Sequence, residues 1–487
     1  MRLWVSISVV FFCLPALAAK GTLPDAPQPQ VPVPQITPLP APVNRQSLPH
    51  INQREADQSD DQLNPAVFSH HLIADRIWIS GQANFIFQAH TPFHSPYAGP
   101  NSFQSRVETT ALSRVLTLYT GVKLARWTEF IFDAEEAGGK GLSQALGMAG
   151  FVNLDVVRNP SLGQGVYAAR YFIHQTIPLT ADRIEEQPNP FYLQDSIPRR
   201  RIEFTMGKMG MVDFFDNNSV GSDSHLQFTN WAIDNNGAYD YAANTRGYTD
   251  GFVIGYLSPS WSLKYGAYLM PILANQQTLE SSFRRARGQN LQLTLSPWST
   301  GTVVRLLAYF NTARMGNYAE ALASAAVSGT TPDIVADDRE GRHKYGFGVN
   351  AEQPLADEGA TGVFLRWGWN DGHTETFAFT EVEQVETLGG QVAGTHWRRP
   401  DDRFGLALVS EALSAGHRAY LAAGGPGFLL GDGRLSYGRE QISAAIHVAA
   451  AGGPGALAGR PGFPVHPQSR LQPRSQSGAL LGGATAS

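Results

Sequence analysis

Cysteine is almost absent from this chain, with one residue, Cys13, among 487. It lies in an N-terminal apolar run that follows Arg2 and ends in Pro15-Ala-Leu-Ala18. That arrangement is typical of a secretory signal cleaved after Ala18, and the run is too short to cross about 30 Å of hydrocarbon. We therefore expect residues 1–18 to be a signal peptide. The mature chain would then have no cysteine, which excludes disulfides and thiolate catalysis.

Long apolar runs and charged residues are also scarce. After the signal, no stretch reaches the roughly 18 consecutive apolar residues of a membrane-spanning helix. Charged residues make up only 16% of the chain, the net charge is −5, and no polybasic run occurs, which argues against a nucleic-acid partner. Because 43% of the residues are nonetheless hydrophobic, the apolar surface must be distributed in another way.

A proline-rich stretch precedes the folded part. Eight prolines lie between Pro24 and Pro42, and such spacing favours extended polyproline II structure that forms no core. We expect residues 19–65 to be a disordered periplasmic segment. A role as a ligand for a partner domain is the alternative.

Beyond Pro65 the hydrophobic pattern has a period of two, which is typical of half-buried strands. One face of each segment is apolar, with Trp and Tyr near its ends, and the other mixes Arg, Lys and Glu with Gly. The clearest examples are Ala169–His174, Arg201–Gly207, Trp261–Leu269, Val303–Phe310, Lys344–Glu352 and Gly362–Asn370. A soluble sandwich or propeller would show the same period. Aromatic ends and segments of about 9–11 residues favour strands that cross a membrane.

The sequence therefore predicts an all-β protein, a transmembrane antiparallel β-barrel with long outer loops and short periplasmic turns. Only a closed barrel lets such strands satisfy their backbone groups in lipid. About 16 strands fit into residues 66–440, and a barrel of that size leaves an aqueous channel.

The inward faces of these strands supply candidate residues for a channel lining. Mixed signs of charge on these faces would disfavour strong selection for ions, and binding to a channel lining must stay weak enough for release. The candidates are Arg201, Glu203, Lys264, Tyr268, Arg305, Tyr309, Lys344, Glu352 and Arg366. For each of them, a structural ion pair or packing role is the alternative.

A long segment, Asp213 to Tyr248, is a candidate constriction of the channel. It is rich in Asn, Asp and Gly, which favour turns. If it folds into the lumen, it would carry Trp231 and Tyr239 there as aromatic platforms for a solute. The alternative is an ordinary outer loop.

Several longer motifs carry a resemblance to a known family. They are Ile79–His90, Gly346–Asn350, Trp367–Gly372, Trp397–Asp402, Gly424–Gly433 and Tyr437–Glu440. Together they resemble the carbohydrate-selective outer-membrane porins of the OprB type. The resemblance implies a 16-stranded barrel in the bacterial outer membrane that passes neutral sugars by passive diffusion. It leaves the sugar unspecified, and both homotrimer and monomer remain open.

Signals of catalysis or metal binding are weak. The chain has no G-x-S-x-G, H-E-x-x-H or Walker A motif, and its histidine pairs lack further spaced ligands. We expect no catalytic residues, no metal and no cofactor. Two alternatives remain: a non-conducting barrel that binds or anchors a partner, and an outer-membrane enzyme.

The composition changes after Glu440. Residues 441–487 contain no Asp, Glu, Trp or Tyr, so the sequence predicts that the final strands of a barrel are missing. A reading-frame shift shortly after Glu440 is our hypothesis, because the shifted frame permits N-P-G-Y-N-R-D-R, which resembles a final-hairpin motif of the family. A genuine disordered tail is the alternative.

Overall fold

The computed structural model describes most of the chain after Arg76. The described residues are 76–94, 99–157, 165–186, 188–225, 227–377, 381–399, 402–427, 430–432, and the backbone of 439–450 and 475–485. The expected signal peptide and proline-rich segment lie outside these residues. Within them, no helix is long and apolar enough to cross a membrane.

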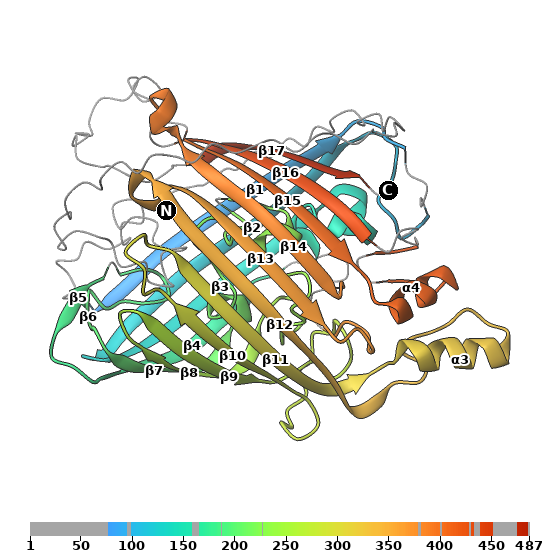
Figure 1. Ribbon diagram of the computed structural model, residues 1–487, viewed down its shortest axis with the longest axis horizontal. Helices are drawn as coiled ribbons and strands as arrows, with labels where there is room; N and C mark the ends of the chain where they lie inside the picture. The colour runs from blue at the N-terminus through green and yellow to red at the C-terminus, as the bar shows by residue number, and fades with distance from the viewer. Residues whose placement is uncertain are drawn as a thin grey trace, which may run out of the picture.

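One antiparallel sheet of fifteen strands dominates the described structure, and neighbours in the sheet follow one another along the chain (Figure 1). Its strands are β1 (Ile77–His90), β2 (Glu108–Ala125), β3 (Thr128–Lys140), β4 (Tyr167–Pro178), β7 (Arg201–Met209), β8 (Thr249–Leu257), β9 (Trp261–Tyr268), β10 (Arg287–Leu295), β11 (Val303–Met315), β12 (Arg339–Ala356), β13 (Thr361–Asn370), β14 (Gln384–Ala393), β15 (Arg403–Ala412), β16 (Arg439–Ala450) and β17 (Ser475–Thr485). A separate two-stranded sheet pairs β5 (Arg183–Glu185) with β6 (Ser196–Pro198). The predicted all-β antiparallel architecture is confirmed.

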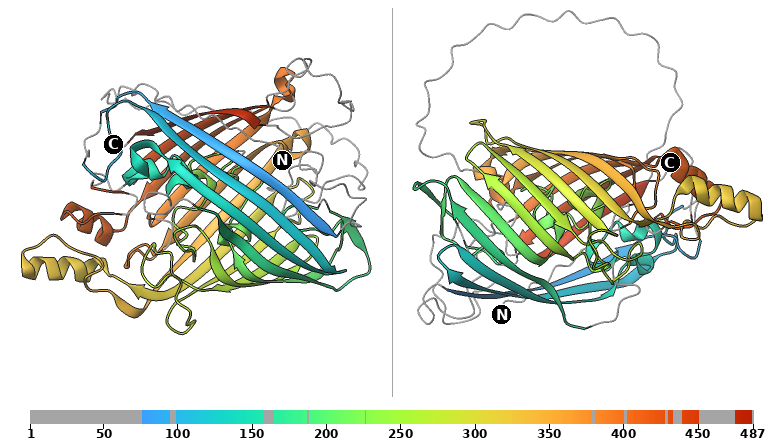
Figure 2. Two further views of the ribbon diagram at one scale, coloured as in Figure 1. Left: turned by 180° about the vertical axis from the view of Figure 1, so that it is seen from behind. Right: turned by 90° about the horizontal axis from the view of Figure 1, so that it is seen from below.

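The two faces of the large sheet differ in the way that the period of two predicts. In β12, Tyr345 and Phe347 are 41% and 50% exposed, whereas Lys344, which directly precedes Tyr345 and points to the other face, is fully buried. The strands curve around a common interior (Figure 2), so the exposed apolar side chains lie on the outside and the charged ones point inward. This arrangement inverts that of a soluble protein and suits a wall that faces lipid.

The connections differ between the two ends of the large fifteen-stranded sheet, which we call the wall. At one end, the turn end, strands are joined by short segments such as 126–127 and 258–260. At the other, the loop end, the connections are long and carry α3 (Tyr318–Ser328) and α4 (Ala415–Ala422) (Figure 1). Asn317 caps α3 by accepting hydrogen bonds from the backbone of Ala319 and Glu320.

One connection at the turn end departs from the expected short turns. Residues 179–200 join β4 to β7 and contain β5 and β6, which lie at the opposite end of the wall from α3 and α4 (Figure 1). The sequence pattern did not reveal this because loop length alone does not show whether a connection stays outside or folds inward.

The sheet continues past the boundary expected at Glu440. β16 pairs with β15, and β17 pairs with β16. No strands were expected here, because residues 441–487 contain no Asp, Glu, Trp or Tyr. Alternation does persist up to Ala450, with Ile442, Ile446 and Val448 separated by other residues at even spacing. Among the described residues, the ladders leave β1 and β17 at the two ends of the sheet. The reading-frame hypothesis rests on Gly462–Ser487, of which only the backbone of 475–485 lies within the described residues, and it stays a prediction.

Candidate functional site

The interior of the wall is partly filled by a segment of the chain itself. Residues 210–248, which join β7 to β8, include the short helix α2 (Trp231–Asp234). The segment contacts inner faces of distant strands through its own backbone. Asn350 on β12 donates a hydrogen bond to the Asp216 carbonyl at 2.7 Å, and Tyr309 on β11 donates one to the Ala238 carbonyl at 2.8 Å. We call residues 210–248 the inserted segment.

Arg366 on β13 makes the most extensive polar contacts with the inserted segment. Its Nε lies 2.8 Å from Asp216 Oδ2, and both side chains are buried. Its other nitrogens donate to the Ile233 carbonyl at 2.6 Å and to Ser222 Oγ at 2.9 Å. A buried charge is tolerated when it is paired and hydrogen-bonded, so this guanidinium holds three parts of the segment against one strand.

Two further charged contacts connect the wall with the inserted segment. Arg305 Nη2 lies 2.6 Å from Glu352 Oε1, and Glu352 Oε2 accepts hydrogen bonds from the backbone and hydroxyl of Ser219. Lys344 Nζ lies 3.7 Å from Asp240 Oδ2, with both side chains fully buried. These inward charges are thus balanced locally.

Two glycines allow the inserted segment to approach the wall closely. Gly348 on β12 and Gly368 on β13 are paired in register. A Cβ at Gly368 would overlap the Asn236 amide, and one at Gly348 would lie 2.9 Å from Asn236 Nδ2. Side chains larger than hydrogen at these positions would therefore push residue 236 away from the wall.

The aromatic candidates are buried in the same packing. Trp231 and Tyr239 of the inserted segment are each at most 2% exposed, and Tyr239 packs against Tyr309 with ring centroids 5.3 Å apart. Tyr268 on β9 is fully buried against Phe215. Contact of these rings with a solute stays a prediction, and the geometry favours a packing role.

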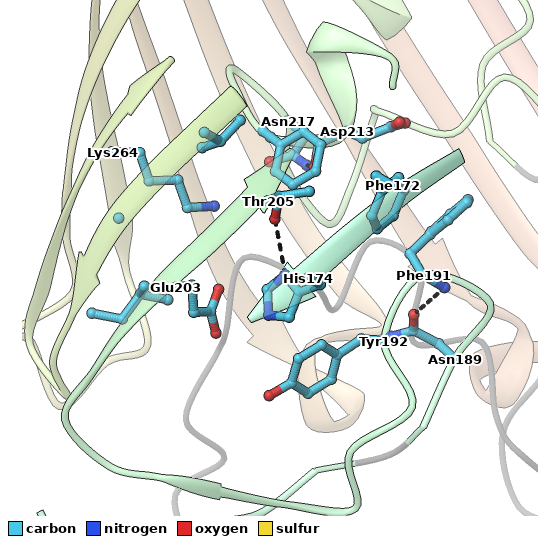
Figure 3. Close-up of a pocket in the computed structure, with 14 residues that line it drawn as sticks. Phe172, His174, Asn189, Phe191, Tyr192, Glu203, Thr205, Asp213, Asn217 and Lys264 are labelled. Carbon is cyan, nitrogen blue, oxygen red and sulfur yellow. Dashed lines mark hydrogen bonds between the residues drawn. The ribbon is translucent and has the colours of Figure 1, made fainter. Parts of the chain in front are cut away.

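The other candidates divide into two groups. All the strand candidates lie on the inner face, as expected from the pattern. Arg305, Lys344, Glu352 and Arg366 are covered by the inserted segment. Arg201 donates to Glu203 Oε1 at 2.7 Å. Glu203 and Lys264 line a pocket (Figure 3).

This pocket lies where the 179–200 connection meets the inner faces of β4, β7, β8 and β9. About 800 Å³ of space lies between its lining residues, a value that includes open solvent at its mouth. The side chains of Glu203 and Lys264 point toward its centre, which His174 and Tyr192 also border (Figure 3). We call it the turn-end pocket. Sequence reasoning found Glu203 and Lys264 from their strand faces but missed the residues of the connection.

Another polar contact, formed by His225, holds the inserted segment near β1. His225 Nε2 lies 3.1 Å from Oδ1 of Asp155, a residue of the short helix α1 (Leu154–Val157). Asp155 Oδ2 in turn accepts a hydrogen bond from the Asn84 side chain on β1. Burial lowers the pKa of the His225 imidazole, but the Asp155 carboxylate outweighs this effect and raises the pKa to about 9. The link is therefore an ion pair at neutral pH.

Comparison with known proteins gives a consistent result. The model of the family described as "Carbohydrate-selective porin, OprB family" matches residues 108–440. The high-pH structure of Pseudomonas putida OprB is similar, with 15% identity, a TM-score of 0.55, and coverage of 78% of this chain and 86% of that chain. In-vitro folded OmpT of Vibrio cholerae is 10% identical over 77% of this chain and 82% of that chain, with a TM-score of 0.37. Comparison with curated proteins gives no match.

Proposed function

Because the chain belongs to the OprB family of carbohydrate-selective porins, we propose that neutral sugars diffuse through its lumen past the inserted segment. The resemblance carried by the sequence motifs is confirmed. The chain is an outer-membrane β-barrel and a passive channel for carbohydrates. The path through the lumen and the residues along it are our proposal.

The observation that carries this proposal is the local balance of charge inside the wall. Arg305 with Glu352, Arg366 with Asp216, and Arg201 with Glu203 form pairs at 2.6–2.8 Å. A lumen whose charges are paired in this way presents no strong field of one sign, and it therefore disfavours selection for ions. Neutral solutes pass such a lumen at a small electrostatic cost.

The inserted segment supplies the size limit in this proposal. It lies inside the wall and is held at several strands, so it narrows the space that a solute crosses. We expect the permeant to be a neutral sugar, the surrounding partner to be outer-membrane lipid, and the process to involve no covalent chemistry. A monomer and a homotrimer are both compatible with this function.

Liposome swelling tests the proposal directly. Refolded full-length protein is reconstituted and diluted into isosmotic sugars of rising size, with protein-free liposomes and charged solutes of similar size as controls. We expect faster swelling with monosaccharides than with the charged solutes, and a steep fall for larger sugars. Absence of swelling with every sugar would contradict the proposal and favour a non-conducting barrel that binds or anchors a partner.

A further inference from the structure

We propose that the turn-end pocket is a binding subsite for a single pyranose ring, and that Glu203 and Lys264 determine its selectivity. This inference rests on the proposed function, because a sugar must first enter the lumen to reach the pocket. It goes further by assigning the binding step to one place on the wall. That place is separate from the contacts between Arg366 and the inserted segment.

The pocket exists because the 179–200 connection folds inward. Its chain reversal is fixed by an isolated bridge between Asn189 and Tyr192, and the Asn189 side chain accepts a hydrogen bond from the Phe191 backbone at 3.0 Å. The Leu193 backbone donates to Glu129 on β3 at 3.2 Å. The connection therefore presents Phe191 and Tyr192 in a fixed position, and a preorganised surface loses little entropy on binding.

Aromatic rings form one side of the pocket. Phe191 is partly exposed and has Arg170 over its ring at 4.5 Å, whereas Tyr192 is only 1% exposed and packs edge-on against His174 with ring centroids 5.2 Å apart. Phe214 of the inserted segment reaches the pocket from the other direction. The C–H groups on the flat face of a pyranose pack well on such rings, and ligand sites generally combine aromatic lining with few polar groups.

Polar groups of complementary kinds form the opposite side. The Glu203 carboxylate only accepts hydrogen bonds, and the Lys264 ammonium only donates them. Both point into the pocket, near the hydrogen-bonded pair His174 and Thr205, which are 2.9 Å apart (Figure 3). Sugar hydroxyls both donate and accept, so they match a carboxylate beside an ammonium. Glu203 is itself paired with Arg201 at 2.7 Å, so a neutral ring meets a locally balanced carboxylate beside an ammonium.

Two substitutions test the assigned roles with little change of shape. Lys264→Met removes the ammonium but keeps the length of the side chain. Glu203→Gln keeps an oxygen that accepts from Arg201. The matched control is Lys123→Met, because Lys123 is also partly buried on the inner face near the turn end but does not line the pocket.

The measurement is the block of single-channel KCl current by D-glucose in planar bilayers, with mannitol as an open-chain solute of similar size. For the unmodified protein we expect block at lower concentrations of D-glucose than of mannitol. In Lys264→Met and Glu203→Gln we expect the half-blocking D-glucose concentration to rise by about tenfold, the loss typical of one charge-assisted hydrogen bond. Lys123→Met should stay within about twofold of the unmodified protein.

A third variant tests the space rather than the polar groups. Gly255 on β8 lines the pocket, and a Cβ there would lie 3.1 Å from Lys264 Cγ, so Gly255→Leu fills the cavity. We expect it to abolish the preference for D-glucose over mannitol while a KCl current remains. That current shows that each variant has folded.

The outcomes separate this inference from the proposed function. The unmodified protein can pass monosaccharides in liposomes while D-glucose blocks the Lys264→Met and Gly255→Leu channels at the same concentrations as the unmodified channel. In that case the subsite is refuted and the porin function stands. If the unmodified protein passes no sugar, both fail together. Equal loss of block in Lys123→Met would also refute the assignment, because the effect would then be one of general charge.

Discussion

Arg366 on β13 and Asp216 in the inserted segment lie 2.8 Å apart, Nε to Oδ2, with both side chains buried inside the wall. Residues of this kind suggested a lining for solutes when only the strand pattern was known. In the structure the guanidinium is surrounded by protein acceptors instead, at Ile233 and Ser222 as well as Asp216. We infer that it positions the inserted segment, and contact of Arg366 with a solute stays a prediction.

Removal of this guanidinium should destabilise the protein. Arg366→Met leaves the Asp216 carboxylate buried without its cation, which typically costs about 3–5 kcal/mol. The free energy of unfolding, measured by tryptophan fluorescence in urea with the protein in detergent, should fall by that amount. Arg314→Met is the control, since Arg314 pairs with Asp338 while half of its side chain is exposed, and such pairs contribute under about 1 kcal/mol. Equal losses in the two variants would contradict the role of Arg366.

Substitution of Gly368 should open the lumen. In Gly368→Val the added side chain overlaps Asn236, so the inserted segment cannot reach its position on β13. We expect single-channel conductance to rise by about twofold or more, because a wider constriction passes more ions. Ala308→Val adds similar bulk to the outward face of β11 and should leave the conductance unchanged. A Gly368→Val channel with unaltered conductance would show that the inserted segment does not limit flow.

Stability should depend on pH through His225. Its pKa is about 9 in the folded protein, above the ordinary value of 6.5, because Asp155, Asp223 and Glu135 outweigh the effect of burial. A raised histidine pKa contributes stability that is complete below pH 6.5 and is lost as the pH rises through 9, by at most about 3 kcal/mol. Urea unfolding at pH 6, 8 and 10 measures the decline. His225→Gln should flatten it, and an unchanged decline in that variant would assign the pH dependence to other groups.

The outward face should reject charge. Leu388 on β14 is 58% exposed and lies beside Leu365 and Leu408 on the neighbouring strands. Leu388→Arg places a cation among these side chains, which costs about 2–4 kcal/mol near the middle of a bilayer. The yield of folded protein in lipid vesicles should fall accordingly, while Leu388→Ile should fold like the unmodified chain. Undiminished folding of Leu388→Arg would mean that this face does not meet lipid.

The strand faces were predictable from the sequence because the side-chain period of a strand is fixed by its backbone. Lys344, Arg305 and Arg366 point inward as the pattern required. Their burial was not predictable, because it depends on contacts such as that of Arg366 with Ile233, residues separated by 133 positions. No local pattern carries information about a partner so far away.

The turn-end pocket was missed for a related reason. Glu203 and Lys264 could be placed on inner faces, but the pocket also needs Phe191 and Tyr192, which lie in a connection without a regular period. The strand β16 was missed for a different reason. Its alternation uses aliphatic residues such as Ile442 and Ile446, and the absence of Phe, Trp and Tyr hid it.

The position of the inserted segment in the chain has a consequence for the order of assembly. The segment follows β7, yet the wall residues that hold it lie on later strands, among them Tyr309, Asn350 and Arg366. Contacts over such long separations form late, since closing a long loop costs entropy that only many native contacts repay. During folding the wall must therefore extend to β13 before the segment can dock, so the nascent lumen is wide first and narrow afterwards.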